Sequence, residues 1–67
     1  MENDNLSNFV KSLRKKQRLN QKQLAELAGV GLRFVRDLEQ GKKTLRMDKV
    51  NQLLKMFGFK LGPVRMK

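Results

Sequence analysis

The glycines of this chain separate short segments whose apolar residues repeat at the spacing of one helix face. The first segment spans about 5–19 and carries these apolar residues: Leu6, Phe9, Val10 and Leu13. Gly29, Gly41 and Gly58 each follow such a segment, and glycine just past the last helical residue is typical of a helix end. The pattern predicts an all-α fold of short helices.

With 67 residues, the chain has room for one domain and no second core. Domains of this size usually depend on disulfides, a metal or a partner chain. The sequence has no cysteine and no histidine, so disulfides are excluded and the main zinc ligands are missing. We therefore expect no metal, no cofactor and no catalytic residue, and we expect self-association as the remaining support.

Lysine and arginine number 16 against 6 aspartates and glutamates, which gives a formal net charge of +10. This charge predicts attraction to a polyanion, either nucleic acid or a membrane surface. All 4 aromatic residues are phenylalanines at core-like positions, which argues against an RNA-stacking platform or a membrane-interface belt. No signal-peptide segment or membrane-length apolar run is present, so we expect a soluble, cytoplasmic protein that binds DNA and no membrane.

The second predicted helix has the clearest start in the sequence. Asn20 can cap it, and Gln23, three residues on, can complete a capping box. Leu19 and Leu24 are placed for a hydrophobic staple across this start. Leu24 then begins an inner stripe that includes Ala25 and Ala28, and Gly29 ends the helix.

The third predicted helix ends at Gly41 and has two distinct faces. Its inward residues are Phe34, Val35 and Leu38. Its outward residues, at spacings of three and four, are Arg33, Arg36, Asp37 and Gln40. A fourth helix, about 47–57, is expected to bury the following residues: Met47, Val50, Leu53, Leu54 and Phe57.

The residues after Gly58 change period, because Phe59, Leu61 and Pro63 alternate with Lys60 and Gly62. The alternation predicts a short β-strand, and its unpaired backbone groups favour pairing with the same strand of a second copy. We assign dimerisation to Phe59, Leu61 and Val64, with a frayed tail as the alternative.

The segment 20–41 resembles the helix-turn-helix of the Xre/lambda-repressor-like family. The resemblance rests on Gln21-x-x-Leu24-Ala25, followed by Gly29-Val30, Val35, Leu38, Glu39 and Gly41, and extends over 6–58. It implies a four- to five-helix DNA-binding domain over 1–58, with 59–67 as a dimerisation strand and tail. Within this family the chain looks most like the HipB-type antitoxins, through its basic first helix, the segment TLRMDKVNQLLKMFGFKLG and the predicted strand.

The HipB resemblance implies a repressor of its own operon that forms a homodimer and binds a HipA-like Ser/Thr kinase toxin. A stand-alone or phage-type Xre regulator without a toxin partner is the alternative. The resemblance places the DNA contacts at Asn20, Gln21 and Lys22, and at the reading positions Leu32, Arg33, Arg36 and Asp37. Leu32 departs from the polar residue that the family often carries there.

Arginine suits base reading because its guanidinium can span O6 and N7 of guanine. The alternative is that Arg33 and Arg36 are solvated surface residues. Lys42 and Lys43 follow the third predicted helix and are expected either to contact the DNA backbone or to be solvated. By resemblance, Arg14 and Glu39 form an internal ion pair. Asp48 is interpreted as a first-turn residue favoured by the helix dipole.

Overall fold

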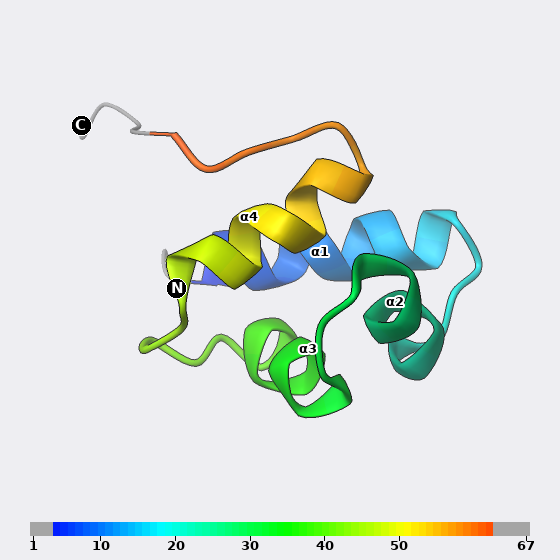
Figure 1. Ribbon diagram of the computed structural model, residues 1–67, viewed down its shortest axis with the longest axis horizontal. Helices are drawn as coiled ribbons and strands as arrows, with labels where there is room; N and C mark the ends of the chain where they lie inside the picture. The colour runs from blue at the N-terminus through cyan, green and yellow to red at the C-terminus, as the bar shows by residue number, and fades with distance from the viewer. Residues whose placement is uncertain (1–3, 63–67) are drawn as a thin grey trace.

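The computed structural model describes residues 4–62, and Figure 1 shows how their helices are arranged. The helices are α1 (Asp4–Lys16), α2 (Gln21–Ala28), α3 (Leu32–Glu39) and α4 (Met47–Met56). α3 packs against both α1 and α2, and α4 packs against α2. In Figure 1, α2 and α3 lie below α1 and α4, and the chain after α4 turns back along that helix. None of these helices combines the length and apolarity needed to span a membrane.

The core is aliphatic and takes side chains from all four helices. Its buried members are Val10, Leu24, Ala25, Ala28, Val35, Leu38, Val50, Leu53 and Leu54. Phe34 and Phe57 pack against this core while only partly buried. The prediction that Met47 is buried is wrong, since 67% of it is exposed. Leu45, in the loop before α4, packs against the core in its place.

α1 is shorter than its apolar pattern predicted, because it ends at Lys16 and not near Leu19. The N–H of Arg18 donates to the Lys15 carbonyl at 3.0 Å, and the N–H of Leu19 donates to the Arg14 carbonyl at 3.1 Å. This pair of bonds is the Schellman motif, which closes a helix around one left-handed residue. Here that residue is Arg18, with φ of 58°.

The predicted start of α2 is confirmed in atomic detail. The N–H of Gln23 donates to Oδ1 of Asn20 at 2.7 Å, and the N–H of Asn20 donates to Oε1 of Gln23 at 2.8 Å, which forms the capping box. Leu19 packs against the core that includes the buried Leu24, which is compatible with the predicted hydrophobic staple. The predicted end is also confirmed, since Gly29 is left-handed with φ of 73°.

The predicted β-strand over 59–64 is not formed in its described part, residues 59–62, and residues 4–62 contain no fifth helix. The ring of Phe59 instead meets the ring of Phe9 edge to face, with centroids 4.9 Å apart. The N–H of Leu61 donates to Oδ1 of Asn51 on α4 at 2.8 Å. The Leu61 N–H is thus bonded to a side chain of α4 and is not left for pairing with a strand of a second copy. Val64 lies outside the described residues.

Candidate nucleic-acid interface

The outer face of α3 carries two unpaired arginines. Arg33 and Arg36 are exposed, while Val35 and Leu38 on the opposite face are completely buried. Within residues 4–62, neither guanidinium has an ion-pair or hydrogen-bond partner. Both therefore keep all their donors available to a ligand.

The other two reading positions are partly engaged within the protein. Leu32 is half-buried and packs against the core, so only part of its side chain can meet DNA. Asp37 is half-buried, and its Oδ2 lies 3.5 Å from Nζ of Lys42. The exposed surface of α3 is therefore dominated by arginine, with Asp37 and Leu32 at its margins.

The start of α3 also has free donors. Gly31 occupies the N-cap position and supplies no side-chain hydrogen bond to the helix. The first N–H groups of a helix have no partner inside the helix, and they point toward any anion placed at its end. α2 differs, because Asn20 already bonds one of its N–H groups.

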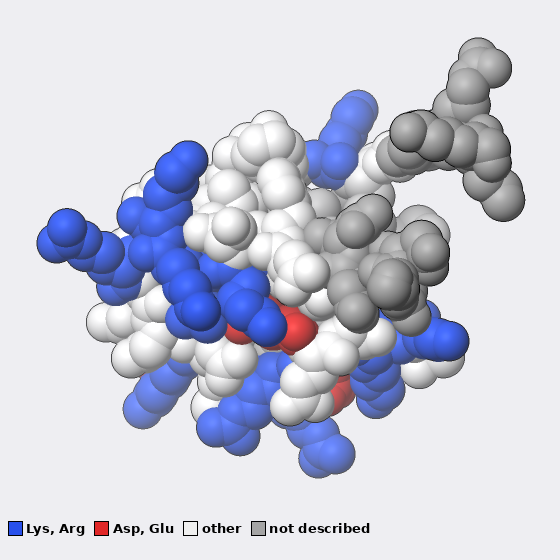
Figure 2. Space-filling model, turned by 180° about the vertical axis from the view of Figure 1, so that it is seen from behind, with Lys and Arg blue, Asp and Glu red and all other residues white. Residues whose placement is uncertain are grey.

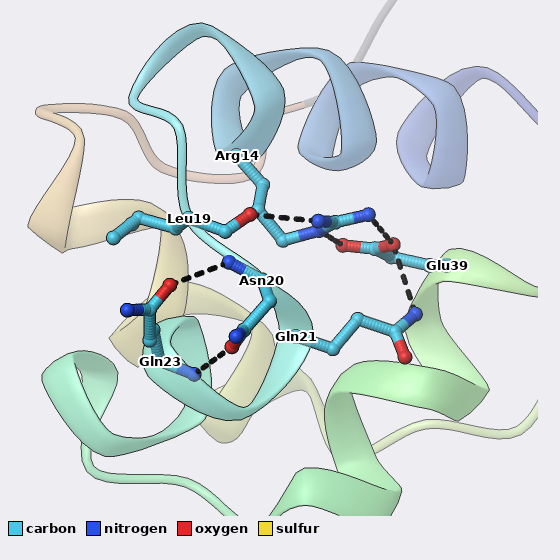
Figure 3. A network of polar contacts seen from close by, with 6 residues as sticks. All are labelled: Arg14, Leu19, Asn20, Gln21, Gln23 and Glu39. Carbon is cyan, nitrogen blue, oxygen red and sulfur yellow. Dashed lines mark hydrogen bonds and ion pairs between the residues drawn. The ribbon is translucent and has the colours of Figure 1, made fainter.

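Polar side chains from α1, α2 and α3 meet at one junction and link the three helices (Figure 3). Glu39 of α3 accepts from Nε of Arg14 at 2.7 Å, from Nη2 of Arg14 at 3.0 Å and from Nε2 of Gln21 at 3.1 Å. Nη1 of Arg14 donates to the Leu19 carbonyl at 2.8 Å. Arg14 and Glu39, the pair implied by the family resemblance, thus link α1 to α3, and Gln21 adds α2.

Of the three DNA contacts predicted at the start of α2, two fall on side chains that have partners inside the protein, and one falls on an exposed side chain. The side chains of Asn20 and Gln21 are used within the protein, the first as a cap and the second as a donor to Glu39. Lys22 is exposed and has no ion-pair partner within residues 4–62. The bond between Gln21 and Glu39 was not found from the sequence, because it joins residues 18 positions apart and has no local pattern.

Gln52 of α4 holds the turn between α2 and α3. Its Nε2 donates to the carbonyl of Ala28 at 2.9 Å and to the carbonyl of Gly29 at 3.0 Å. These carbonyls belong to the end of α2, where helix carbonyls lack partners within the helix. Gln52 has no recognisable signal in the sequence, since its role depends on a contact 24 residues away.

The loop after α3 carries exposed lysines and one exposed ion pair. Lys42 and Lys43 are both exposed. Nη2 of Arg46 lies 2.7 Å from Oδ2 of Asp48, and the Arg46 hydrogen bond holds the pKa of the Asp48 carboxyl below its ordinary value. Asp48 lies in the first turn of α4, as expected. Within residues 4–62, no group of three carboxylates is arranged to hold a metal ion.

The end of α1 lies on the right of Figure 1, which is the left side of Figure 2. Basic side chains gather on this side of the space-filling view. Lys15, Lys16 and Arg18 are exposed there, close in sequence to Lys22. The sequence shows these charges, but the predicted DNA contacts begin only at Asn20. The structure thus extends the basic surface beyond the helix-turn-helix.

A capped helix, a glycine turn and a second helix with an exposed basic face define a helix-turn-helix DNA-binding protein. The chain belongs to the Xre-like Helix-turn-helix family, because residues 10–63 match that family. It is also similar to the uncharacterised HTH-type transcriptional regulator y4mF of Sinorhizobium fredii. The two are 52% identical over 50 residues, a match that covers 75% of this chain and 66% of the relative.

Proposed function

We propose that this protein is a transcriptional repressor that inserts α3 into the major groove of an operator. The observation that carries the proposal is the pair of unpaired arginines, Arg33 and Arg36, on a helix whose opposite face is buried. An arginine fork matches the two acceptors of guanine. Asp37 can accept a hydrogen bond from the amino group of cytosine, and the exposed part of Leu32 can meet a thymine methyl.

Contacts to the DNA backbone would flank this readout. Lys22 at the start of α2, and Lys42 and Lys43 after α3, are exposed cations that precede and follow α3 in the chain. Gln21 would contribute mainly through its backbone N–H in the first turn of α2, since its side chain bonds Glu39. Asn20 would act mainly by holding this helix start in place, because its own N–H and its side chain both bond Gln23. Such contacts orient the protein and make binding depend on salt.

We further propose that the protein acts as a homodimer on an imperfect palindrome, with half-sites about 34 Å apart. Phe59 remains 47% exposed although it contacts Phe9, and Leu61 is half-buried beside it. These residues, with Val64 beyond the described region, are the proposed dimer contact. Deletion from residue 59 onward should give a monomer with much weaker operator binding, measured by sedimentation and by titration. An unchanged dimer would contradict this assignment.

The antitoxin role is a narrower proposal that rests on the HipB resemblance. In it the protein represses its own operon in the cytoplasm and restrains a HipA-like Ser/Thr kinase. The relative from Sinorhizobium fredii is named only as a transcriptional regulator, which fits equally well with a stand-alone regulator. Co-purification of this protein with the product of the adjacent gene would distinguish the antitoxin from the stand-alone regulator. A neighbouring gene with no kinase features, or no co-purification, would favour the stand-alone regulator.

The repressor proposal is tested by selecting duplexes from a random library with the full chain. Enrichment of one palindromic sequence, bound more tightly than random duplex in competition, is the expected result. The double variant with Arg33→Ala and Arg36→Ala should no longer distinguish the selected duplex from random DNA. A parent protein that enriches no sequence would contradict sequence-specific binding.

A further inference from the structure

All four helices of residues 4–62 end in the same way, but one of them ends on an unexpected residue. After each helix, one N–H bonds the carbonyl three residues back, and the next N–H bonds the carbonyl five residues back. This is the Schellman motif, with its left-handed residue just past the helix. α2, α3 and α4 use Gly29, Gly41 and Gly58 there, and α1 uses Arg18.

The use of arginine at this position is unfavourable for the fold. Arg18 has φ of 58° and is the one non-glycine residue within 4–62 with a positive φ. Side chains with a Cβ are strained in the left-handed region, and glycine is not. Strained backbone of this kind persists at sites where the residue serves a function. Arg18 therefore needs an explanation other than helix termination.

The favourable interaction of cations with a helix C-terminus does not supply that explanation. It accounts for the basic last turn of α1, which contains Arg14, Lys15 and Lys16. Three cations already occupy that turn, and a fourth beyond it need not take the left-handed position. Arg18 is exposed and has no ion-pair partner within residues 4–62, so no contact inside the described chain requires its guanidinium.

The surroundings of Arg18 are suited to a polyanion. Lys15, Lys16 and Lys22 are exposed and are likewise without ion-pair partners within 4–62. Basic side chains form a group on this side of the molecule in Figure 2. The Leu19 carbonyl beside Arg18 is held by Arg14, so the turn that carries Arg18 is fixed to the junction between α1 and α3.

We propose that Arg18 binds a backbone phosphate of the duplex outside the half-site read by α3. This interaction rests on the proposed DNA-binding function and extends it to a segment before the helix-turn-helix. Arg18 lies two residues before the N-cap of α2, on the α1 side, and so outside the helix-turn-helix itself. Lys15 and Lys22 would add charge on the two sides of this phosphate. A guanidinium binds phosphate through two parallel hydrogen bonds, which suits a fixed position.

The protein-side test uses Arg18→Gly, which gives α1 the same end as the other helices. The Tm of this variant should equal or exceed that of the parent. Its affinity for the selected duplex should fall about three- to tenfold, and the salt slope should decrease by about one for each phosphate that is no longer bound. Arg18→Lys should retain part of the affinity. Lys55→Gln removes an exposed charge from α4 and should bind like the parent.

The DNA-side test replaces single phosphates outside the half-site by neutral methylphosphonates. One such replacement should weaken the parent and leave Arg18→Gly unaffected, because that variant has no guanidinium to bind the phosphate. Equal affinity and salt slope for Arg18→Gly and the parent would overturn the proposal, as would an equal loss of affinity in Lys55→Gln. A lower Tm for Arg18→Gly would show that the residue serves the fold and would also overturn it.

The same experiments separate the repressor function from the Arg18 interaction. A parent protein that enriches no duplex sequence contradicts the proposed repressor function, and the binding of phosphate by Arg18 falls with it. A parent that binds its selected duplex while Arg18→Gly matches it contradicts the Arg18 interaction alone.

Discussion

Arginine occurs in two contrasting places in this molecule. At the junction of α1, α2 and α3, the Arg14 side chain is 13% exposed and uses Nε, Nη1 and Nη2 in hydrogen bonds, two of them to Glu39. On the outer face of α3, Arg33 and Arg36 are exposed and have no partner within residues 4–62. The same side chain therefore stabilises the fold where it meets a buried carboxylate, and is left for a ligand where it does not.

The largest expected effect tests the inner arginine. Arg14→Ala leaves the Glu39 side chain, which is 2% exposed, as a buried carboxylate without its charged partner. Breaking a buried ion pair from one side destabilises by about 3–5 kcal/mol, and urea denaturation should show a loss of this size. Glu39→Ala should lose less, because Arg14 is nearer to water. Equal losses would contradict the difference in burial.

The outer arginines should behave in the opposite way. Arg33→Ala or Arg36→Ala should cost about 1–3 kcal/mol of binding on the selected duplex, and little on random DNA. The free energy of unfolding should change by no more than about 0.5 kcal/mol, as for surface substitutions without partners. A loss of stability comparable with that of Arg14→Ala would erase the contrast between the two faces.

A smaller effect is expected at the start of α2, where Asn20 is exposed yet structural. Asn20→Ala removes the side-chain acceptor for the Gln23 N–H and should cost about 1 kcal/mol of stability. Asn8→Ala is the matched control, because Asn8 is exposed within α1 and alanine is the better helix former there. Chemical denaturation should therefore give a loss at position 20 and none at position 8.

The smallest effect is expected from the exposed pair of Arg46 and Asp48. The hydrogen bond from Arg46 lowers the pKa of the Asp48 carboxyl. The stability that this provides is present above the carboxyl's unfolded pKa and is lost as the pH falls through the lower, folded pKa. An NMR titration should place the Asp48 pKa higher in Arg46→Ala. Because the pair is solvent-exposed, stability at neutral pH should barely change.

Local chemistry explains which elements the sequence could predict. The capping box of Asn20 and Gln23 and the left-handed Gly29 involve neighbours in the chain, and both bounds of α2 were predicted correctly. The two faces of α3 were predicted because Val35 and Leu38 repeat at helical spacing. These features depend on residues no more than four positions apart.

The predictions that failed depended on packing or on an unusual residue. The end of α1 was placed too late because Arg18 occupies a position that glycine usually marks. The burial of Met47 was inferred from periodicity, although Leu45 covers the core there. The strand was inferred from the alternation of residue types after Gly58. In the structure Phe59 contacts Phe9 and Leu61 bonds Asn51, and the alternation does not reveal these contacts. Gln21 and Gln52 were similarly assigned no structural role, since their partners are far away in sequence.

The division of α3 into two faces also sets how readily this protein can change over evolutionary time. Substitutions at Arg33 and Arg36 would alter the proposed base contacts without disturbing any bond inside residues 4–62, so new operator preferences can arise in single steps. Leu32 is less free to vary, because it also packs against the core. A lineage that diverges in binding preference should therefore change at the arginines first, and at position 32 only together with the core residues around it.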